Sequence, residues 1–336
     1  MKGSVLMPKS NSKQLVKSAR DFKSSKASKH ISSVFQSAVR YFILLSIGYI
    51  VLYPLIYMVS ASFSAKESFL DPTSVWIPTK VTLDNFKFMW GVMDYGKAFL
   101  STLRIPMVSA VIEIATCAIV AYGFARFKFP FRRMLFSLLF VTMLIPSAMI
   151  AVPSMVNFSK MDILGIFGLL NKLTGVDIRP NLLGTAWTFY LPAIFASGIR
   201  SGILIYIYIQ FFKGLPSELE EAAWIDGATP LRTFISIALP SSSVVILTVS
   251  VFSVIWYWND YFLATMYMDE NYPLAVTMGK LNDLINYAGI YLTPDRPEGL
   301  AYLMVACLMF ILPPLIFYLI VQRWFVESID RVGITG

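Results

Sequence analysis

The sequence predicts an all-α integral membrane protein with six transmembrane helices, and three observations lead to this fold class. Hydrophobic residues make up 57% of the 336 residues and charged residues 14%, whereas an average soluble domain has about one half and about a quarter. Six apolar stretches are each long enough to cross about 30 Å of hydrocarbon as a helix. They do not alternate in polarity as barrel strands do. A water-soluble enzyme, a disordered regulator and a secreted disulfide scaffold are therefore excluded.

The six spans are expected at residues 41–63, 99–124, 134–156, 183–212, 240–263 and 301–322. The parts that face lipid must be helical, because every backbone amide there needs a partner within the segment. Prolines recur inside the spans, at Pro54, Pro106, Pro146, Pro153, Pro192, Pro313 and Pro314. Each proline removes an amide donor and bends its helix, so the six helices are expected to be kinked.

A basic segment, residues 1–40, precedes the six-helix domain of residues 41–336. It holds nine of the 28 Lys and Arg residues but only one of the 20 acidic residues, Asp21. It lacks the apolar core of a signal peptide, and a cytoplasmic tail beside anionic lipid explains its charge better than nucleic-acid binding. With residue 1 inside, the inner segments carry 17 Lys and Arg and the outer segments 9. The positive-inside rule therefore predicts that both termini are cytoplasmic.

Patterns typical of catalysis and metal binding are missing from the sequence. Cys117 and Cys307 lie in apolar runs, as expected for small buried hydrophobic residues. The single histidine, His30, lies in the basic tail. No phosphate-binding loop, serine nucleophile elbow or zinc-protease motif occurs. We therefore expect no catalytic residue, no metal site and no cofactor on this chain, so that its energy must come from another subunit.

The loop between spans four and five, residues 213–240, predicts two short helices with a break between them. Ser217 and Glu220 have the spacing of a capping box at the start of the first helix. Gly227 suits the left-handed position after its last turn. Thr229 followed by Pro230 is typical of the start of a second helix.

One face of the first loop helix suits a protein partner. The helical spacing brings four residues onto this face: Leu219, Ala222, Ala223 and Asp226. Two small alanines would allow close approach of another surface. The four acidic side chains of the segment would be unfavourable against an anionic inner leaflet. A protein partner therefore explains the segment better than a helix that rests on lipid.

The same loop resembles a known family. The run Glu221-Ala222-Ala223, followed at fixed intervals by Gly227, Ile237 and Leu239-Pro240, is similar to the EAA loop of permease subunits of binding-protein-dependent ABC importers. The similarity extends over residues 41–336 and is closest to the carbohydrate-importing branch that includes the maltose permeases. Further matching segments are Gln210 to Pro216, Ala121 to Phe127, Trp258 to Phe262, and Gln322 to Val326.

The resemblance implies a fold and a role for the loop. The fold is that of a type I ABC importer (MetI-like) permease, and the loop is the coupling helix that docks on a cytoplasmic ATPase. Glu221 would contact the ATPase, the two alanines would permit close approach, and Gly227 would allow the turn. The residues implied in ATPase coupling are Glu220, Glu221, Ala222, Ala223, Asp226, Gly227, Leu239 and Pro240.

The resemblance also implies a set of partners. They are a second, homologous permease subunit in a heterodimer, two cytoplasmic ATPase subunits that use ATP and Mg²⁺, and an extracytoplasmic solute-binding protein. The assembly would move a carbohydrate, expected to be an oligosaccharide, across a bacterial or archaeal cell membrane into the cytoplasm. This chain would be a multi-pass transport subunit surrounded by lipid, and not an enzyme.

Two charges are expected deep in the membrane, Glu113 in span two and Arg200 in span four. A charge at the bilayer centre costs about 2.5–3.5 kcal/mol on insertion scales, so such residues pair or line a wet path. One interpretation is a structural ion pair between Glu113 and Arg200. The other places Arg200 in the solute path, where its planar guanidinium could hold a carboxylate or phosphate of an acidic sugar.

Aromatic residues near the end of span five are further candidates for the solute path. Trp256, Tyr257, Trp258 and Asn259 could stack on a sugar ring and bond its hydroxyl groups. Helix packing or an aromatic belt at the membrane interface explains the same residues more simply. Both interpretations stay open at this point.

Three other functions are compatible with parts of the sequence. An ABC importer permease for another small solute would share the EAA loop. An ion-coupled secondary transporter could use Glu113 as a proton carrier, although it would give no reason for the spacing of the loop. A structural or signalling membrane subunit could recruit a partner through its basic tail.

Overall fold

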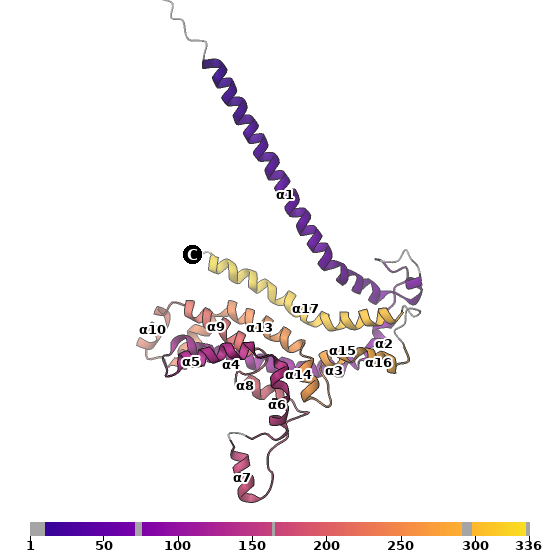
Figure 1. Ribbon diagram of the computed structural model, residues 1–336, viewed down its shortest axis with the longest axis vertical. Helices are drawn as coiled ribbons and strands as arrows, with labels where there is room; N and C mark the ends of the chain where they lie inside the picture. Colours follow the sequence, from indigo (N-terminus) through magenta and orange to yellow (C-terminus); the bar gives the residue numbers. More distant parts are fainter. Residues whose placement is uncertain (1–10, 71–75, 163–164, 291–297, 334–336) are drawn as a thin grey trace, which may run out of the picture. The chain divides into compact units, whose positions relative to one another are not determined.

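A computed structural model describes residues 11–70, 76–162, 165–290 and 298–333 of the chain (Figure 1). In these residues the regular structure is helical, and the β-pairing is limited to an isolated antiparallel bridge between Ser64 and Val81. The chain divides after Ser60 into two units. Each unit is described by itself.

The first unit consists largely of one long helix. Helix α1 (Asn11–Phe63) has 53 residues and continues without a break past residue 40, where the basic tail meets the first predicted span. Its part Val34–Phe63 is long and apolar enough to cross a membrane.

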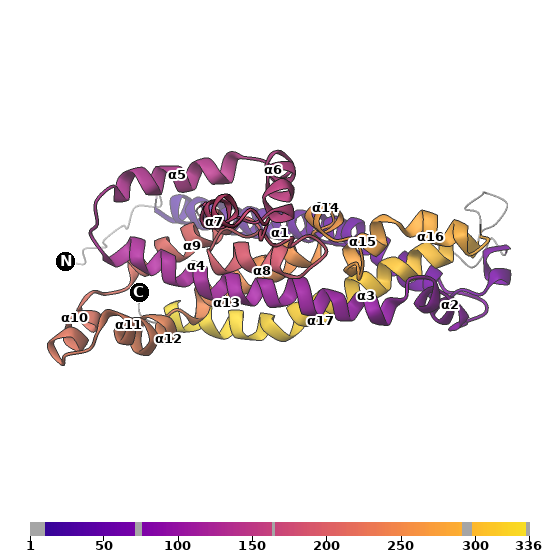
Figure 2. The same ribbon diagram turned by 90° about the horizontal axis from the view of Figure 1, so that it is seen from below.

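The second unit begins at Ala61. Its first half contains η1 (Lys66–Leu70), α2 (Asp84–Val92), α3 (Tyr95–Thr102), η2 (Leu103–Met107), α4 (Val108–Arg126), α5 (Arg132–Leu144), α6 (Ser147–Ser159) and α7 (Ile166–Thr174). Its second half contains α8 (Trp187–Ile194), α9 (Ser201–Gly214), α10 (Glu218–Ile225), α11 (Pro230–Thr233), η3 (Phe234–Ala238), α12 (Leu239–Ser241), α13 (Ser243–Trp258), α14 (Phe262–Tyr267), α15 (Leu274–Gly279), α16 (Leu281–Tyr287) and α17 (Glu298–Gly333). Helices α10 to α12 lie at one end of this unit, and α2 and α16 at the other (Figure 2).

The helices confirm the predicted class of fold but not the number of spans. In the described residues, three helices are long and apolar enough to cross a membrane: Val34–Phe63, Tyr95–Arg126 and Gly299–Trp324. Two bent pairs would raise the number to five, namely α5 with α6, bent by 102°, and Pro230–Ser241 with α13, bent by 82°. The fourth predicted span is divided instead, because residues 195–200 separate α8 from α9.

Several breaks in the helices coincide with prolines. Pro106 lies in η2, which is a turn of π-helix, and Pro240 stands two residues after the end of η3, which is another. A proline lacks the amide that would bond four residues back, and its ring crowds that carbonyl, so a wider turn relieves the clash. Pro146 is extended, with ψ of 140°, at the bend between α5 and α6. The kink predicted at Pro146 is confirmed, and at Pro106 the helix changes to a π-turn. Pro240 was not among the prolines predicted to bend a span. The other predicted prolines lie inside helices that continue through them, namely Pro54, Pro153, Pro192, Pro313 and Pro314.

The largest buried cluster surrounds α4, which packs against α8, α9 and α13. Small residues of α4, Cys117, Ala118 and Ala121, allow the neighbouring helices to approach closely. Gly202 of α9 serves the same purpose toward α5, since a Cβ there would lie 2.9 Å from the Thr142 hydroxyl oxygen. Both cysteines are free thiols; Cys117 is fully buried, as the sequence predicts, whereas Cys307 is only half-buried.

Candidate functional site

The loop that connects α9 to α13 forms two helices separated by a sharp break. Helix α10 ends at Ile225, and Gly227 has a φ of +82°, a left-handed conformation that glycine adopts without strain. The Thr229 hydroxyl then accepts a hydrogen bond from the Arg232 amide at 3.4 Å, and Pro230 is the first helical residue of α11. The predicted arrangement of helix, break and helix is confirmed.

The predicted capping box between Ser217 and Glu220 is wrong. Ser217 makes no side-chain cap at the start of α10. The Glu220 carboxylate turns toward α4, where it accepts hydrogen bonds from Arg126 Nε at 2.9 Å and from the Tyr122 hydroxyl at 3.1 Å. A hydrogen bond from a charged guanidinium is stronger than one from a neutral backbone amide. Glu220 therefore bonds to Arg126 and not to the amides at the start of α10.

The rest of α10 forms an exposed surface of acidic and apolar side chains. Leu219 is 51% and Ile225 86% exposed, although large apolar side chains are more often covered. We call this the α10 surface, and it comprises Glu218, Leu219, Glu221, Ala222, Trp224, Ile225 and Asp226. Of the other residues predicted for ATPase coupling, Gly227 and Pro240 are exposed, Ala223 and Leu239 are half-buried, and Glu220 is buried.

A cavity of about 940 Å³ lies where α5, α6, α8, α9 and α13 meet. Arg200 directly precedes α9 in a left-handed conformation, with φ of +56°, and its side chain lines the cavity. The Arg200 guanidinium carbon lies 5.1 Å from the centre of the Trp256 ring, which places a cation over an aromatic face. Hydroxyl groups also line the wall, from Thr142, Ser147, Ser154, Thr188, Ser197 and Ser201.

The predicted ion pair between Glu113 and Arg200 does not form. Glu113 is fully buried, and neither carboxylate oxygen has a regular hydrogen bond to any residue that the structure describes. The Tyr257 hydroxyl faces the carboxylate, and Gly198 lies against both, since a Cβ there would be 2.4 Å from the Tyr257 hydroxyl oxygen. Arg200 is exposed to the cavity instead.

The residues at the end of α13 separate according to the direction in which they point. Trp256, Tyr257 and Asn259 line the cavity, whereas Trp258 is buried between Phe99 and Phe310 in another cluster. Successive helical residues point about 100° apart, so three in a row cannot share one side. Among the aromatic candidates for the solute path, Trp258 therefore lies outside the cavity.

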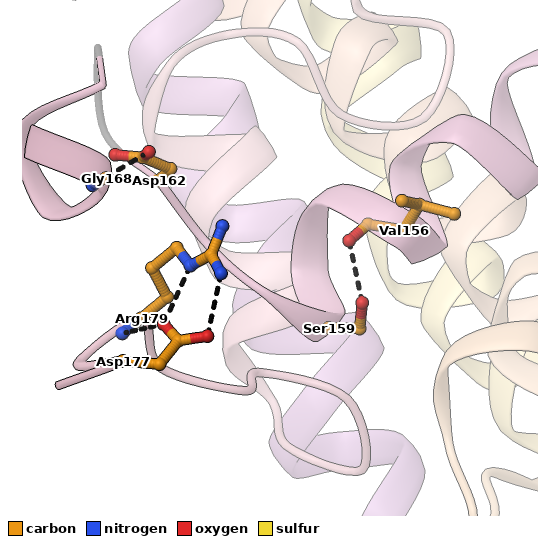
Figure 3. Close-up of polar contacts among 6 residues, drawn as sticks. All are labelled: Val156, Ser159, Asp162, Gly168, Asp177 and Arg179. Carbon is orange, nitrogen blue, oxygen red and sulfur yellow. Dashed lines mark hydrogen bonds and ion pairs between the residues drawn. The ribbon is translucent and has the colours of Figure 1, made fainter. Parts of the chain in front are cut away.

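A loop with its own polar contacts follows α6 and includes α7 (Figure 3). The Asp162 carboxylate accepts hydrogen bonds from the amides of Phe167 and Gly168, both at 3.0 Å, and thereby caps the start of α7. The Arg179 guanidinium donates two hydrogen bonds to the Asp177 carboxylate, from Nε to Oδ1 at 2.8 Å and from Nη2 to Oδ2 at 2.7 Å (Figure 3). These hydrogen bonds lower the pKa of Asp177 from 3.8 to about 2.

The comparisons with known proteins identify the family. Residues 114–331 match the family described as binding-protein-dependent transport system inner membrane component. The matched region is more than half of the chain and contains both the α10 surface and the cavity. The chain belongs to this family. The protein is accordingly a permease, that is, a transport component located in the membrane. It is not an enzyme.

The permease is similar to curated proteins over most of its length. It is 27% identical over 298 residues to the polygalacturonan/rhamnogalacturonan transport system permease protein YtcP of Bacillus subtilis (strain 168), covering 86% of this chain and 94% of that protein. It is 29% identical over 269 residues to the probable starch degradation products transport system permease protein AmyC of Thermoanaerobacterium thermosulfurigenes, covering 80% and 86%.

A solved structure has the same fold as the permease. It is a chain of a bacterial ABC transporter involved in the import of the acidic polysaccharide alginate, with a TM-score of 0.64 and 21% identity. The likeness covers 88% of the permease and 98% of that chain. The type I importer fold expected from the sequence is thereby supported.

The structure adds three residues that the sequence-based site lacks: Tyr122, Arg126 and Asp260. Asp260 lines the cavity and caps α14 by accepting bonds from the amides of Leu263 and Ala264. Tyr122 and Arg126 stand four residues apart at the end of an apolar span, and that spacing places them on one helix face. The sequence offered one signal for a partner of Arg126: the loop of residues 213–240 is rich in acidic residues. Among the described residues, no group of three or more His, Cys, Asp or Glu could hold a metal ion.

Proposed function

We propose that the permease is one of two homologous membrane subunits in an ATP-driven importer of carbohydrates. The observation that carries this proposal is the α10 surface, a protruding acidic and apolar helix within the region that matches the family. The relatives YtcP and AmyC are named for transport of polysaccharides and starch products, which supports a carbohydrate, expected to be an oligosaccharide, as the solute.

The α10 surface is the proposed contact with a cytoplasmic ATPase subunit. Exposed Leu219, Trp224 and Ile225 supply apolar area that a partner would cover. Exposed Glu221 beside Ala222 offers a charge where the backbone can be approached closely. Two such ATPase subunits would bind ATP and Mg²⁺, and their closure would move α10 and switch the membrane helices.

We propose six spans with both termini in the cytoplasm. The spans are α1 from Val34, the rod Tyr95–Arg126, α5 with α6, α8 with α9, α11 to α13, and α17. Pairing α8 with α9 as one interrupted span keeps the loop of α10 on the same side as the basic residues of the tail. An extracytoplasmic binding protein would then deliver solute to the opposite side, and the dependence on a binding protein in the family description supports such a partner.

The cavity is the proposed solute path. Trp256 could stack on a sugar ring, while Asn259 and the hydroxyl groups of the wall could bond its hydroxyls. The buried side chain of Tyr257 also lines the cavity. Because the family depends on binding proteins, the path needs no ion-coupled step at Glu113.

A second, narrower proposal is that the solute carries carboxylates. Arg200 places a guanidinium in the cavity wall without an ion pair to any described acidic residue, and such a fork binds carboxylates well. An Arg200→Gln variant is expected to lose uptake of uronate-bearing oligosaccharides while it keeps uptake of neutral ones. Equal loss of both would contradict a role for Arg200 in selecting acidic sugars.

The test of the main proposal uses the permease co-expressed with a candidate companion permease and a candidate ATPase subunit, and assayed with a candidate solute-binding protein. The wild-type complex is expected to retain the ATPase on purification and to take up labelled oligosaccharide into ATP-loaded proteoliposomes. Gly227→Val should abolish both, because a β-branched residue does not tolerate a positive φ. Gly227→Asn, which tolerates that conformation better, is the matched control. Uptake without any ATPase would overturn the proposal.

A further inference from the structure

Helix α10 has an unusual attachment to the rest of the second unit. It packs mainly against α11 and η3, which belong to the same loop. Of its residues Glu218–Ile225, all of which the structure describes, only Glu220 is buried. A short helix normally holds its place through a buried apolar face. Here the one buried side chain is a carboxylate, so polar bonds fix the helix.

These polar bonds join α10 to the end of α4. Arg126 Nε donates to one Glu220 oxygen at 2.9 Å, and the Tyr122 hydroxyl donates to the other at 3.1 Å. The second nitrogen group of Arg126 donates to the carbonyl of Leu215, at the exit of α9, at 3.0 Å. We call Tyr122, Arg126, Leu215 and Glu220 the loop anchor.

The loop anchor is shielded from solvent and geometrically specific. The side chains of Glu220 and Arg126 are 3% and 12% exposed, so their interaction is little screened by salt. The Tyr122 ring packs against Phe212 of α9 and Phe234 of η3, with ring centres 5.5 and 5.0 Å apart. A planar guanidinium can serve two acceptors at once, which the single ammonium of lysine does less well.

The other end of the same rod is also tied to its surroundings. Helices α3, η2 and α4 form the continuous stretch Tyr95–Arg126. The Thr102 hydroxyl accepts a bond from the Leu274 amide at 2.8 Å, and the Tyr95 hydroxyl donates to the Met309 carbonyl at 2.9 Å. Between these ends Glu113 lies against Gly198, which lines the cavity.

We propose that Glu220 and Arg126 are positioning residues that transmit movement of α10 to the α4 rod. This inference rests on the proposed function, and it divides the two adjacent glutamates: Glu221 faces the ATPase, whereas Glu220 faces inward and does not touch it. A push on α10 then reaches the cavity wall through a rigid helix and not through the loop backbone alone.

The first experiment measures uptake per ATP hydrolysed in proteoliposomes of the complete complex with its binding protein. Glu220→Gln is expected to retain the ATPase on purification and to lower uptake per ATP about 5- to 150-fold, the usual range of coupling between two sites. The contrasting variant Glu221→Gln, at the position proposed to contact the ATPase, should lower ATPase retention itself. Loss of ATPase retention in Glu220→Gln, or an unchanged ratio, would overturn the proposal.

The conservative variant Arg126→Lys guards against misfolding. It keeps the buried charges balanced, so the subunit should accumulate in the membrane as the wild type does, yet uptake per ATP should fall because the two-acceptor grip is lost. Wild-type coupling in this variant would contradict the role of the Arg126 fork.

A second measurement needs no ATPase and therefore separates this inference from the proposed function. Spin labels at Leu219→Cys and Lys128→Cys, both exposed positions, report the distance between α10 and the end of α4 in nanodiscs of the full chain. Glu220→Gln should broaden the distance distribution. An unchanged distribution would overturn the anchor even if transport proceeds as proposed, whereas a wild-type chain that retains no ATPase would overturn only the proposed function.

Discussion

Two buried carboxylates, one inside the Tyr95–Arg126 rod and one packed against its end, have opposite surroundings. Glu220 meets the end of α4 and receives bonds from Arg126 and Tyr122. Glu113, near the middle of that rod, has no ion pair or regular hydrogen bond with any described residue. A helix end can present long polar side chains, whereas the middle of a span is surrounded by small apolar residues. The first carboxylate therefore has its charge compensated in this structure, whereas the second does not.

The largest effect is expected when the satisfied carboxylate is neutralised. Glu220→Gln leaves the Arg126 guanidinium buried without its counter-charge, which costs about 3–5 kcal/mol in such cases. The free energy of unfolding, measured by denaturant titration in detergent micelles, should fall by that amount. Replacing both residues by leucine should recover most of the loss, and a double variant as unstable as the single one would contradict this explanation.

The next effect concerns the close packing around Glu113. Gly198→Ala would place a Cβ 2.4 Å from the Tyr257 hydroxyl oxygen and 2.9 Å from Glu113 Oε1, so an overpacking cost of about 1–3 kcal/mol is expected. Gly123→Ala in α4 is the control, because nothing lies within 4 Å of its added Cβ, and it should gain about 0.5–1 kcal/mol. Thermal unfolding of both variants in the same detergent checks the contrast. Equal stability of the two would show that the contact at Gly198 relaxes freely.

A smaller effect is expected when the unsatisfied carboxylate is neutralised. Glu113→Gln breaks no ion pair in the described chain, and an amide is easier to bury than a carboxylate. The free energy of unfolding should stay the same or rise by up to about 1 kcal/mol. A loss as large as that of Glu220→Gln would mean that Glu113 has a strong partner, and the contrast between the two residues would fail.

The smallest effect lies outside the membrane helices, at Asp177. Its folded pKa is lowered to about 2 by the bonds from Arg179, so the folded state binds fewer protons than the unfolded state near pH 3. The stability from this pair is present above the ordinary pKa of 3.8 and is lost as the pH falls toward 2. Asp177 is exposed and Arg179 only half-buried, so water screens the pair. The difference in thermal midpoint between the wild type and Asp177→Asn should therefore change only slightly over this interval. A steep change would place the pair in a less solvated site.

The sequence predicted the parts of the fold that depend on local chemistry. Gly227, Thr229 and Pro230 determine the loop because each acts on its own backbone. The partner of Glu220 could not be predicted in this way, because Arg126 is 94 residues distant and a local capping bond was the nearer alternative. The pairing of Glu113 with Arg200 failed for a related reason: shared depth in a membrane does not fix which way two side chains point.

The π-helical turn at η2 has a further consequence for the permease. A π-turn inserts one residue into an α-helix, and each residue turns the helix by about 100°. The extra residue lets Thr102 face α15 while Cys117 faces α9 on one unbroken rod. Deleting a single position between 103 and 107 would therefore rotate one half of the rod by about 100° relative to the other. Thr102 and Cys117 could then no longer face α15 and α9 at the same time.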